Sequence, residues 1–472
     1  MTFHQPVIKS EGITPSERHL ARLADKSFLK LWAYPNPCRG PGKELCDLLV
    51  VCGPYVIIFS EKTIAWPKGG IDTAWSKWAK RAIRDSEKQA RGAERWICEH
   101  PDRVYLDQKC KSPFPIDLPL KSERIFHRIV VANGASKACR DNTTGSSGSL
   151  IIRSDIKGDQ HWSNISGPVR PFQIGDVDPE GSFVHIFNEY SLDIIMDELD
   201  TVGDFVDYLE KKVALVRTNR LVQADGEENL LAYYAIRTNK AGEHDFVPVD
   251  RPLVINHAHY QKYINDPRYL KKKKADRISY LWDNLIKSFT DHMIHGTNVT
   301  LGDYKFQLKK NEKGVRYMAL EPRLYRRSLS EGIHGAMIRG ATNGSSFRMM
   351  IKGKGSRGYE TAFFIFTLKY YGASVNSQEY EEYRLLRAKF LETYSEGILE
   401  SYSFLKRVIG IGCEPPGQPH GLSEDMVYAE QSQWSEEDRI AIRENCAKLG
   451  ILHPDMATLR WKGQEFPDVE SY

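Results

Sequence analysis

Two apolar runs separated by a two-residue turn constrain the fold of this chain more than any other feature. Residues 45–52 (LCDLLVVC) and 55–61 (YVIIFSE) are rich in aliphatic side chains and are short enough to be strands. Gly53 and Pro54, which separate them, are residues typical of tight turns. Because the runs are almost continuously apolar, with little alternation, we expect strands that are covered on both faces.

Helices and strands alternate through the rest of the first half. A helix is expected at 16–31, where Ser16 precedes leucines at helical spacing, and a second at 72–98. The other elements expected here are strands at 125–132, 149–152 and 182–187 and a helix at 200–216. This order predicts an α/β fold, a mixed sheet flanked by helices.

The second half has a different pattern, typical of an α+β region. Segments rich in small and polar residues at 135–148 and 218–228 are the expected linkers, so we place the domains at 1–217 and 218–472. The elements expected in the second domain are a helix at 280–289, a hairpin of 346–351 with 361–370, a helix at 379–405, a strand at 405–413 and a helix at 435–449.

Charge is distributed unevenly along the chain, although its net value is only +4. Residues 260–360 contain 21 Lys and Arg against 9 Asp and Glu, whereas residues 374–472 contain 10 against 18. A basic middle of this size can attract a phosphate backbone. The candidate nucleic-acid-binding residues are Lys271, Lys272, Lys273, Lys274, Arg323, Arg326 and Arg327. A set of solvated side chains that bind nothing is the alternative interpretation.

Several classes of protein are not indicated. No apolar run approaches the roughly 18 residues of a membrane span, and the N-terminus lacks the form of a secretory signal. We therefore expect a cytoplasmic protein with no membrane partner. The eight cysteines form no CxxC pair, so a structural zinc site is not expected. No GxxxxGK[ST] loop is present, so an ATPase motor or a sensor would have to be a separate partner protein.

Acidic residues lie at the start of the first apolar strand, and a lysine lies at the end of the second. Glu44 and Asp47 precede or begin the first strand, and Lys62 follows the second. Carboxylates beside a cation can hold a divalent metal and stabilise the charge that develops on a phosphate.

Over residues 14–100 the chain resembles the PD-(D/E)xK nuclease superfamily, whose fold is the restriction-endonuclease-like one. The resemblance implies that Asp47 binds Mg²⁺ or Mn²⁺ and that Lys62 orients the attacking water. It also assigns Glu17, on the first helix, and Gln89, on the helix after the strands, to the site.

The sequence departs from the family pattern at the second acidic position. Ser60 stands two residues before Lys62, where the family has Asp or Glu. Because side chains alternate along a strand, Ser60 and Lys62 share one face and Glu61 points to the other. Glu61 could act in the site only if the strand bulges, and Glu44 is the other candidate substitute, as a second metal ligand.

The resulting expectation is a metal-dependent nuclease that hydrolyses DNA, with a role in restriction or anti-phage defence by analogy. One alternative is an inactive nuclease-fold module that binds nucleic acid or a partner protein. Another is an assembly protein whose basic and acidic regions pair between subunits of an oligomer.

Overall fold

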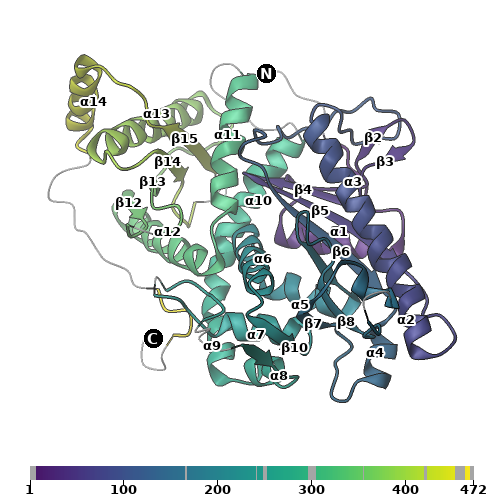
Figure 1. Ribbon diagram of the computed structural model, residues 1–472. Helices are drawn as coiled ribbons and strands as arrows, with labels where there is room; N and C mark the ends of the chain where they lie inside the picture. The colour runs from purple at the N-terminus through teal and green to yellow at the C-terminus, as the bar shows by residue number, and fades with distance from the viewer. Residues whose placement is uncertain are drawn as a thin grey trace. The chain divides into compact units, whose positions relative to one another are not determined.

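The computed structural model describes residues 7–164, 167–240, 242–247, 252–295, 304–354, 356–418, 423–451 and 463–467, and the side chains of 304–309 are outside this description. The chain forms two compact units (Figure 1). Unit 1 comprises Met1–Leu270, Phe289–Asn298 and Ala319–Pro322, and unit 2 comprises Lys271–Ser288, Val299–Met318 and Arg323–Tyr472.

The two apolar runs form an antiparallel hairpin in the main sheet of unit 1. Strand β4 (Leu48–Cys52) pairs with β5 (Tyr55–Thr63), and all five residues of β4 are buried. The sheet order is β1-β4-β5-β6-β9, in which β1 (Ala33–Pro35) is antiparallel to β4, whereas β6 (Ile125–Asn133) and β9 (Val184–Phe187) continue parallel to β5. The predicted mixed α/β architecture is therefore confirmed.

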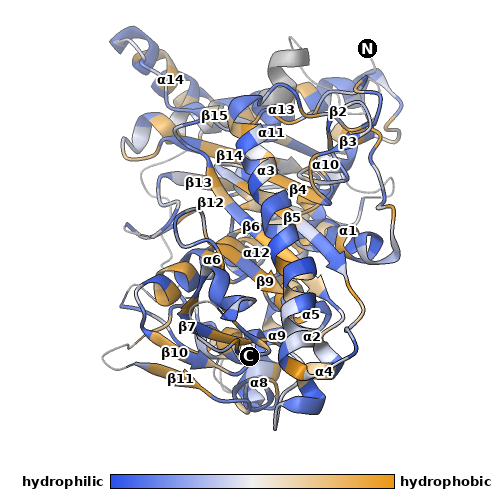
Figure 2. Ribbon diagram, turned by 45° about the vertical axis from the view of Figure 1, so that its right-hand side comes forward, coloured by the Kyte–Doolittle hydropathy of each residue, from blue (hydrophilic) through white to orange (hydrophobic). Residues whose placement is uncertain are grey.

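Helices cover both faces of this sheet, as the apolar strands predicted. Helix α1 (Pro15–Ser27) contacts β1, β4 and β5, and α3 (Asp85–Glu99) packs on β5 and β6. Figure 2 shows α3 mainly in the hydrophilic colour next to the hydrophobic colour of β4 and β5. Helix α3 continues α2 (Ile71–Ala79) through a π-helical turn at Lys80–Arg84.

The first helix differs from its predicted bounds at both ends. Thr14, not Ser16, is the N-cap, and it forms a capping box with Glu17. The helix ends at Ser27, and Leu29 has a positive φ of 64°. Ser16 lies in the first turn instead, where its hydroxyl is free to bond Glu61.

A second sheet in unit 1 contains segments that the sequence assigned to linkers. Strand β10 (Leu221–Ala224), in the expected linker 218–228, pairs with β7 (Ile151–Lys157), and α4 (Ser136–Asn142) occupies the other expected linker. The boundary placed between 217 and 218 thus falls inside unit 1. The other elements are β2 (Cys38–Gly40), β3 (Lys43–Glu44), the short 3-10 helix Gly158–His161, β8 (Gln173–Asp176), α5 (Glu189–Glu198), α6 (Val202–Arg217), α7 (Glu227–Ala235), β11 (Leu253–Ile255) and α8 (His259–Ile264).

Unit 2 is built around a four-stranded sheet of order β12-β13-β14-β15. The expected hairpin is formed by β12 (Ser345–Ile351) and β13 (Thr361–Leu368), and β14 (Arg407–Cys413) lies parallel to β13. The remaining elements after residue 266 are α9 (Pro267–Asp276), the 3-10 turn Arg277–Ser279, α10 (Tyr280–His295), α11 (Tyr304–Ala319), α12 (Arg323–Asn343), α13 (Gln378–Ser401), β15 (Glu424–Glu430) and α14 (Glu436–Leu449).

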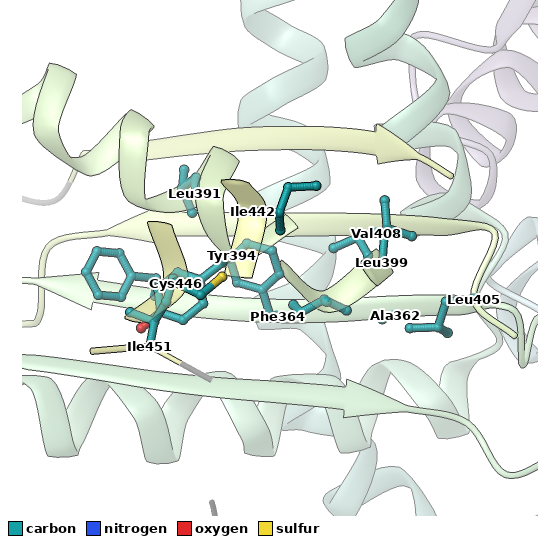
Figure 3. Close-up of a cluster of buried hydrophobic side chains, with 12 residues drawn as sticks. Ala362, Phe364, Leu391, Tyr394, Leu399, Leu405, Val408, Ile442, Cys446 and Ile451 are labelled. Atoms are coloured by element: carbon teal, nitrogen blue, oxygen red, sulfur yellow. The ribbon is translucent and has the colours of Figure 1, made fainter. Parts of the chain in front are cut away.

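One hydrophobic core joins this sheet to α13 and α14. Phe364 of β13, Tyr394 of α13 and Ile442 of α14 are among its buried members (Figure 3). Gly410 of β14 lies against the ring of Phe364, where a Cβ atom would come within 2.1 Å of Cζ. Within the described residues, no helix is long and apolar enough to cross a membrane.

Candidate functional site

Asp47 lies immediately before β4 and is tied to β5 by two hydrogen bonds. Its backbone N–H donates to the Phe59 carbonyl at 3.2 Å, and its carboxylate Oδ2 accepts from the Glu61 backbone N–H at 2.6 Å. Only 9% of the residue is exposed. The sequence therefore holds a carboxylate at the point where the hairpin strands leave the regular ladder.

Burial raises the pKa of Asp47 from 3.8 to about 7, and three neighbouring carboxylates add to this effect. Repulsion from Glu44, Glu17 and Glu61 disfavours the charged form, whereas the hydrogen bond from the Glu61 amide favours it. Asp47 thus forms an acidic cluster with Glu17, Glu44 and Glu61, which come from α1, β3 and β5 respectively.

Asn36, in the loop after β1, joins two members of this acidic cluster. Its side-chain Nδ2 donates to Glu17 Oε2 at 2.9 Å and to Glu44 Oε1 at 2.7 Å. Burial opposes ionisation of Glu17, but the bonds from Asn36 and from the Ile13 and Thr14 amides hold its pKa below the usual value. Burial and the charge of Glu17 instead raise the pKa of Glu44, against the bond from Asn36.

Glu61 belongs to the acidic cluster although β5 has no bulge at this residue. The β5–β6 ladder is regular from Tyr55 to Thr63. The Glu61 backbone N–H binds Asp47, while its carboxylate accepts from Ser16 Oγ at 2.9 Å and from Asn133 Nδ2 at 2.7 Å. The acid therefore lies on the face that α1 covers.

Ser60 lies on the opposite face of β5, towards α3. It is fully buried, and its hydroxyl donates to Gln89 Oε1 at 3.2 Å. Lys62 shares this face by strand alternation and is half-buried. Among the described residues, the side chain of Lys62 has neither a hydrogen-bond partner nor an ion-pair partner, although its backbone belongs to the β5–β6 ladder. The structure thus brings Ser60 and Gln89 together, whereas Lys62 and Glu61 lie on opposite faces of β5.

The hydrogen bonds recorded for the acidic cluster come from uncharged donors. Backbone amides, hydroxyls and the Asn36 and Asn133 amides bond the four carboxylates, and none of the four is ion-paired with a lysine or arginine among the described residues. This leaves uncompensated negative charge in a partly buried place, an arrangement that favours binding of a cation.

The carboxylates fit Mg²⁺ better than a metal that needs a closed cage of ligands. In the described part of the chain, no three His, Cys, Asp or Glu side chains are grouped as ligands of one ion. Mg²⁺ keeps several waters and needs only one or two carboxylates together with substrate phosphate. Asp47 Oδ1 and Glu44 Oε2 have no hydrogen bond to a described residue, so each acid has an oxygen to offer.

The arginines assigned to nucleic-acid binding are in the interior of unit 2. Arg326 is 2% exposed, and its guanidinium bonds Asp283 at 2.6 Å, as does that of Arg323 at 2.8 Å. Arg327 pairs with Asp276 at 3.2 Å. As placed, these three residues do not face a phosphate backbone, because helix α12 buries them against acidic partners. That part of the prediction is corrected.

The four lysines of α9 differ from one another in exposure. Lys272 is buried and pairs with Asp276 and Glu465, at 2.9 Å and 3.1 Å. Lys271 and Lys273 are half-buried, and Lys274 is exposed. Lys272 is therefore removed from the expected binding surface, which retains Lys271, Lys273 and Lys274.

Residues that the sequence did not assign to the site contribute much of it. Asn36, Asn133 and Ser16 bond the carboxylates, and each is an ordinary polar residue in its own segment. The Pro35-Asn36-Pro37 sequence was the only local signal, since it indicates a turn but not its partners.

Comparisons of the chain with models of protein families, with curated proteins and with solved structures found no match. The functional argument therefore depends on the geometry of the acidic cluster.

Proposed function

We propose that the acidic cluster of unit 1 binds Mg²⁺ or Mn²⁺ and that the protein is a metal-dependent nuclease hydrolysing DNA phosphodiester bonds. The observation that carries this proposal is Asp47: a buried carboxylate with a raised pKa, surrounded by three more carboxylates and by uncharged donors. Such a cluster is stabilised by a divalent cation.

Asp47 and Glu44 are the proposed metal ligands, because each has a free oxygen and Asp47 is fixed on the hairpin. A bound divalent cation would supply Lewis-acid activation of water and of the scissile phosphate. Glu17 and Glu61 hold negative charge beside the ligands. Lys62, which has no partner among the described residues, supplies positive charge for the phosphate, and Gln89 orients Ser60.

Exposed lysines of the basic middle are the proposed contacts to the DNA backbone. Lys274 is the first candidate, since its side chain is exposed whereas Lys271 and Lys273 are half-buried. Contacts of this kind hold DNA through its charge and weaken as salt rises. A role in restriction or anti-phage defence is proposed by analogy with nucleases of the resembled superfamily.

A second candidate function is a nuclease-fold module that binds nucleic acid without cutting it. Ser60 favours this candidate, because it is an uncharged residue, bonded to Gln89, on the same face as Lys62. An acid and a lysine on one face are what the resembled superfamily uses, and here Glu61 and Lys62 lie on opposite faces.

Cleavage of supercoiled plasmid by the full chain tests the proposal. We expect nicking with Mg²⁺ or Mn²⁺ and none with EDTA, and a loss of at least about 100-fold in Asp47→Asn and Lys62→Met. Asp72→Asn and Lys68→Met, exposed positions outside the cluster, are matched controls that should cut like wild type.

The outcomes separate the two candidates. Metal-dependent cutting that only the cluster variants lose supports the nuclease. No cutting by wild type, together with a salt-sensitive gel shift on DNA, supports the binding module. Absence of both cutting and binding would overturn both candidates.

A further inference from the structure

Asn36 has a backbone conformation that few residues tolerate, and it is anchored at the centre of the acidic cluster. Its φ is +50°, in the left-handed region that asparagine adopts more readily than most residues. Its backbone N–H donates to the Asp47 carbonyl at 2.9 Å. The same residue thus fixes the main chain of Asp47 and the side chains of two other acids.

The side-chain amide of Asn36 is fully used. Its Oδ1 accepts from Ser10 Oγ at 3.0 Å, and the two N–H groups of Nδ2 donate to Glu17 and Glu44. An ionised carboxylate has no donor, so the amide directs its nitrogen to Glu17 and Glu44, and the orientation of the amide follows from these partners. The residue is buried, which restricts competing water.

The side-chain amide of Asn36 bridges Glu17 and Glu44 without carrying a charge. A lysine or arginine at the same place would also hold two carboxylates, but it would neutralise them and weaken the attraction for a cation. An amide holds Glu17 and Glu44 side by side and leaves their charge available. Hydrogen-bonded neighbours of this kind orient metal ligands and tune their affinity.

We propose that Asn36 is a positioning residue that holds Glu17 and Glu44 in place for a divalent cation. This inference rests on the proposed function of the acidic cluster as a cation site. Asn36 itself is not a ligand in this proposal, because its amide nitrogen carries the donors and its oxygen is bonded to Ser10.

Asn36→Gly is the most direct variant, since glycine accepts the positive φ and removes the hydrogen bonds to Glu17 and Glu44. We expect the dissociation constant for Mn²⁺, measured by calorimetry on the full chain, to rise about 10- to 100-fold. Asn142→Gly, at an exposed position in α4, is the matched control and should bind Mn²⁺ as wild type does.

A second, cation-free measurement distinguishes positioning from general stability. Thermal unfolding of Asn36→Gly, Glu44→Ala and the double variant forms a double-mutant cycle, because alanine removes the oxygen that accepts from Asn36. We expect the double variant to lose less in Tm than the two single losses combined, because each single change already breaks the shared bond. If Asn36→Gly does not fold, Asn36→Asp replaces it, as aspartate keeps the conformation and lacks the donors.

Failure of the inference differs from failure of the proposed function. If wild type binds no Mn²⁺, the cation site is wrong. If wild type binds but Asn36→Gly binds equally tightly, or if the cycle is additive, the positioning role of Asn36 is overturned and the cation site stands.

Discussion

At the scale of single residues, the unusual feature is a carboxylate whose environment opposes its charge. Asp47 is buried against β5, and its carboxylate accepts a hydrogen bond from the Glu61 backbone amide at 2.6 Å. No lysine or arginine among the described residues pairs with it. The protein therefore keeps Asp47 in a costly state, which is the condition for a residue that gains stabilisation from a ligand.

Asp47 makes a testable contribution to the pH dependence of stability. Its folded pKa, about 7, lies above the usual 3.8, so the native state binds more protons between these values. Ionisation of Asp47 therefore lowers the free energy of unfolding as the pH rises from 3.8 to about 7, by up to about 1.4 kcal/mol per pH unit. Below pH 3.8 this cost is absent, and above pH 7 it is fully present.

Asp47→Asn removes the ionisable group, and with it this cost of ionisation, but keeps an oxygen that accepts from the Glu61 amide. We therefore expect the Tm of Asp47→Asn relative to wild type to increase from pH 4 to pH 7, as measured by calorimetry. Mn²⁺ at pH 8 should raise the Tm of wild type more than that of the variant. A constant difference in Tm across this range would contradict the raised pKa.

At the scale of elements, helices α12 and α10 show why a basic sequence is not necessarily a basic surface. Arg323 and Arg326 lie one turn apart on α12, and both bond Asp283 of α10. A helix that buries one face takes long polar side chains with it, and these are tolerated only when they are paired. The charge count of residues 260–360 therefore overstates the exposed positive charge.

Removing Asp283 tests the structural role of this pair of helices. Asp283→Ala leaves two buried guanidinium groups without this carboxylate, so we expect a loss of about 3–5 kcal/mol in the free energy of unfolding. Urea denaturation measures this loss. Lys274→Ala, at an exposed site in α9, should be within about 0.5 kcal/mol of wild type and should weaken DNA binding. Equal stability of the two variants would contradict the assignment.

At the scale of the whole molecule, the chain divides later than its composition indicated. Residues 135–148 and 218–228 have the polarity of linkers, yet α4 and β10 lie within them. Pairing of β10 with β7 holds the later segment to the earlier one, and Glu227 pairs with buried Lys212 at 2.6 Å.

A chain that ends at Arg217 should therefore fail to fold. It lacks β10 and leaves Lys212 buried without Glu227, which costs about 3–5 kcal/mol for the charge alone. A chain that ends at Leu270 keeps both partners and should be more resistant to proteolysis. Limited proteolysis and circular dichroism of the two chains check this expectation, and cooperative melting of the shorter chain would contradict it.

Local pattern was sufficient for much of the fold. The apolar runs of β4 and β5, the turn at Gly53-Pro54 and the hairpin of β12 and β13 follow from hydrophobicity and turn chemistry within a few residues. The same local patterns place the acidic residues Glu44, Asp47 and Glu61 near one hairpin. Each of these inferences needs only neighbours in the chain.

Only the tertiary structure decided which polar groups meet. Asn36 lies 19 residues from Glu17 in sequence, and Asn133 lies 72 residues from Glu61, so no local pattern could pair them. The burial of Arg326 and the pairing of β10 with β7 depend in the same way on distant segments. Hydrophobic periodicity records which face of an element is covered, whereas the partner that covers it is set by packing of the whole chain.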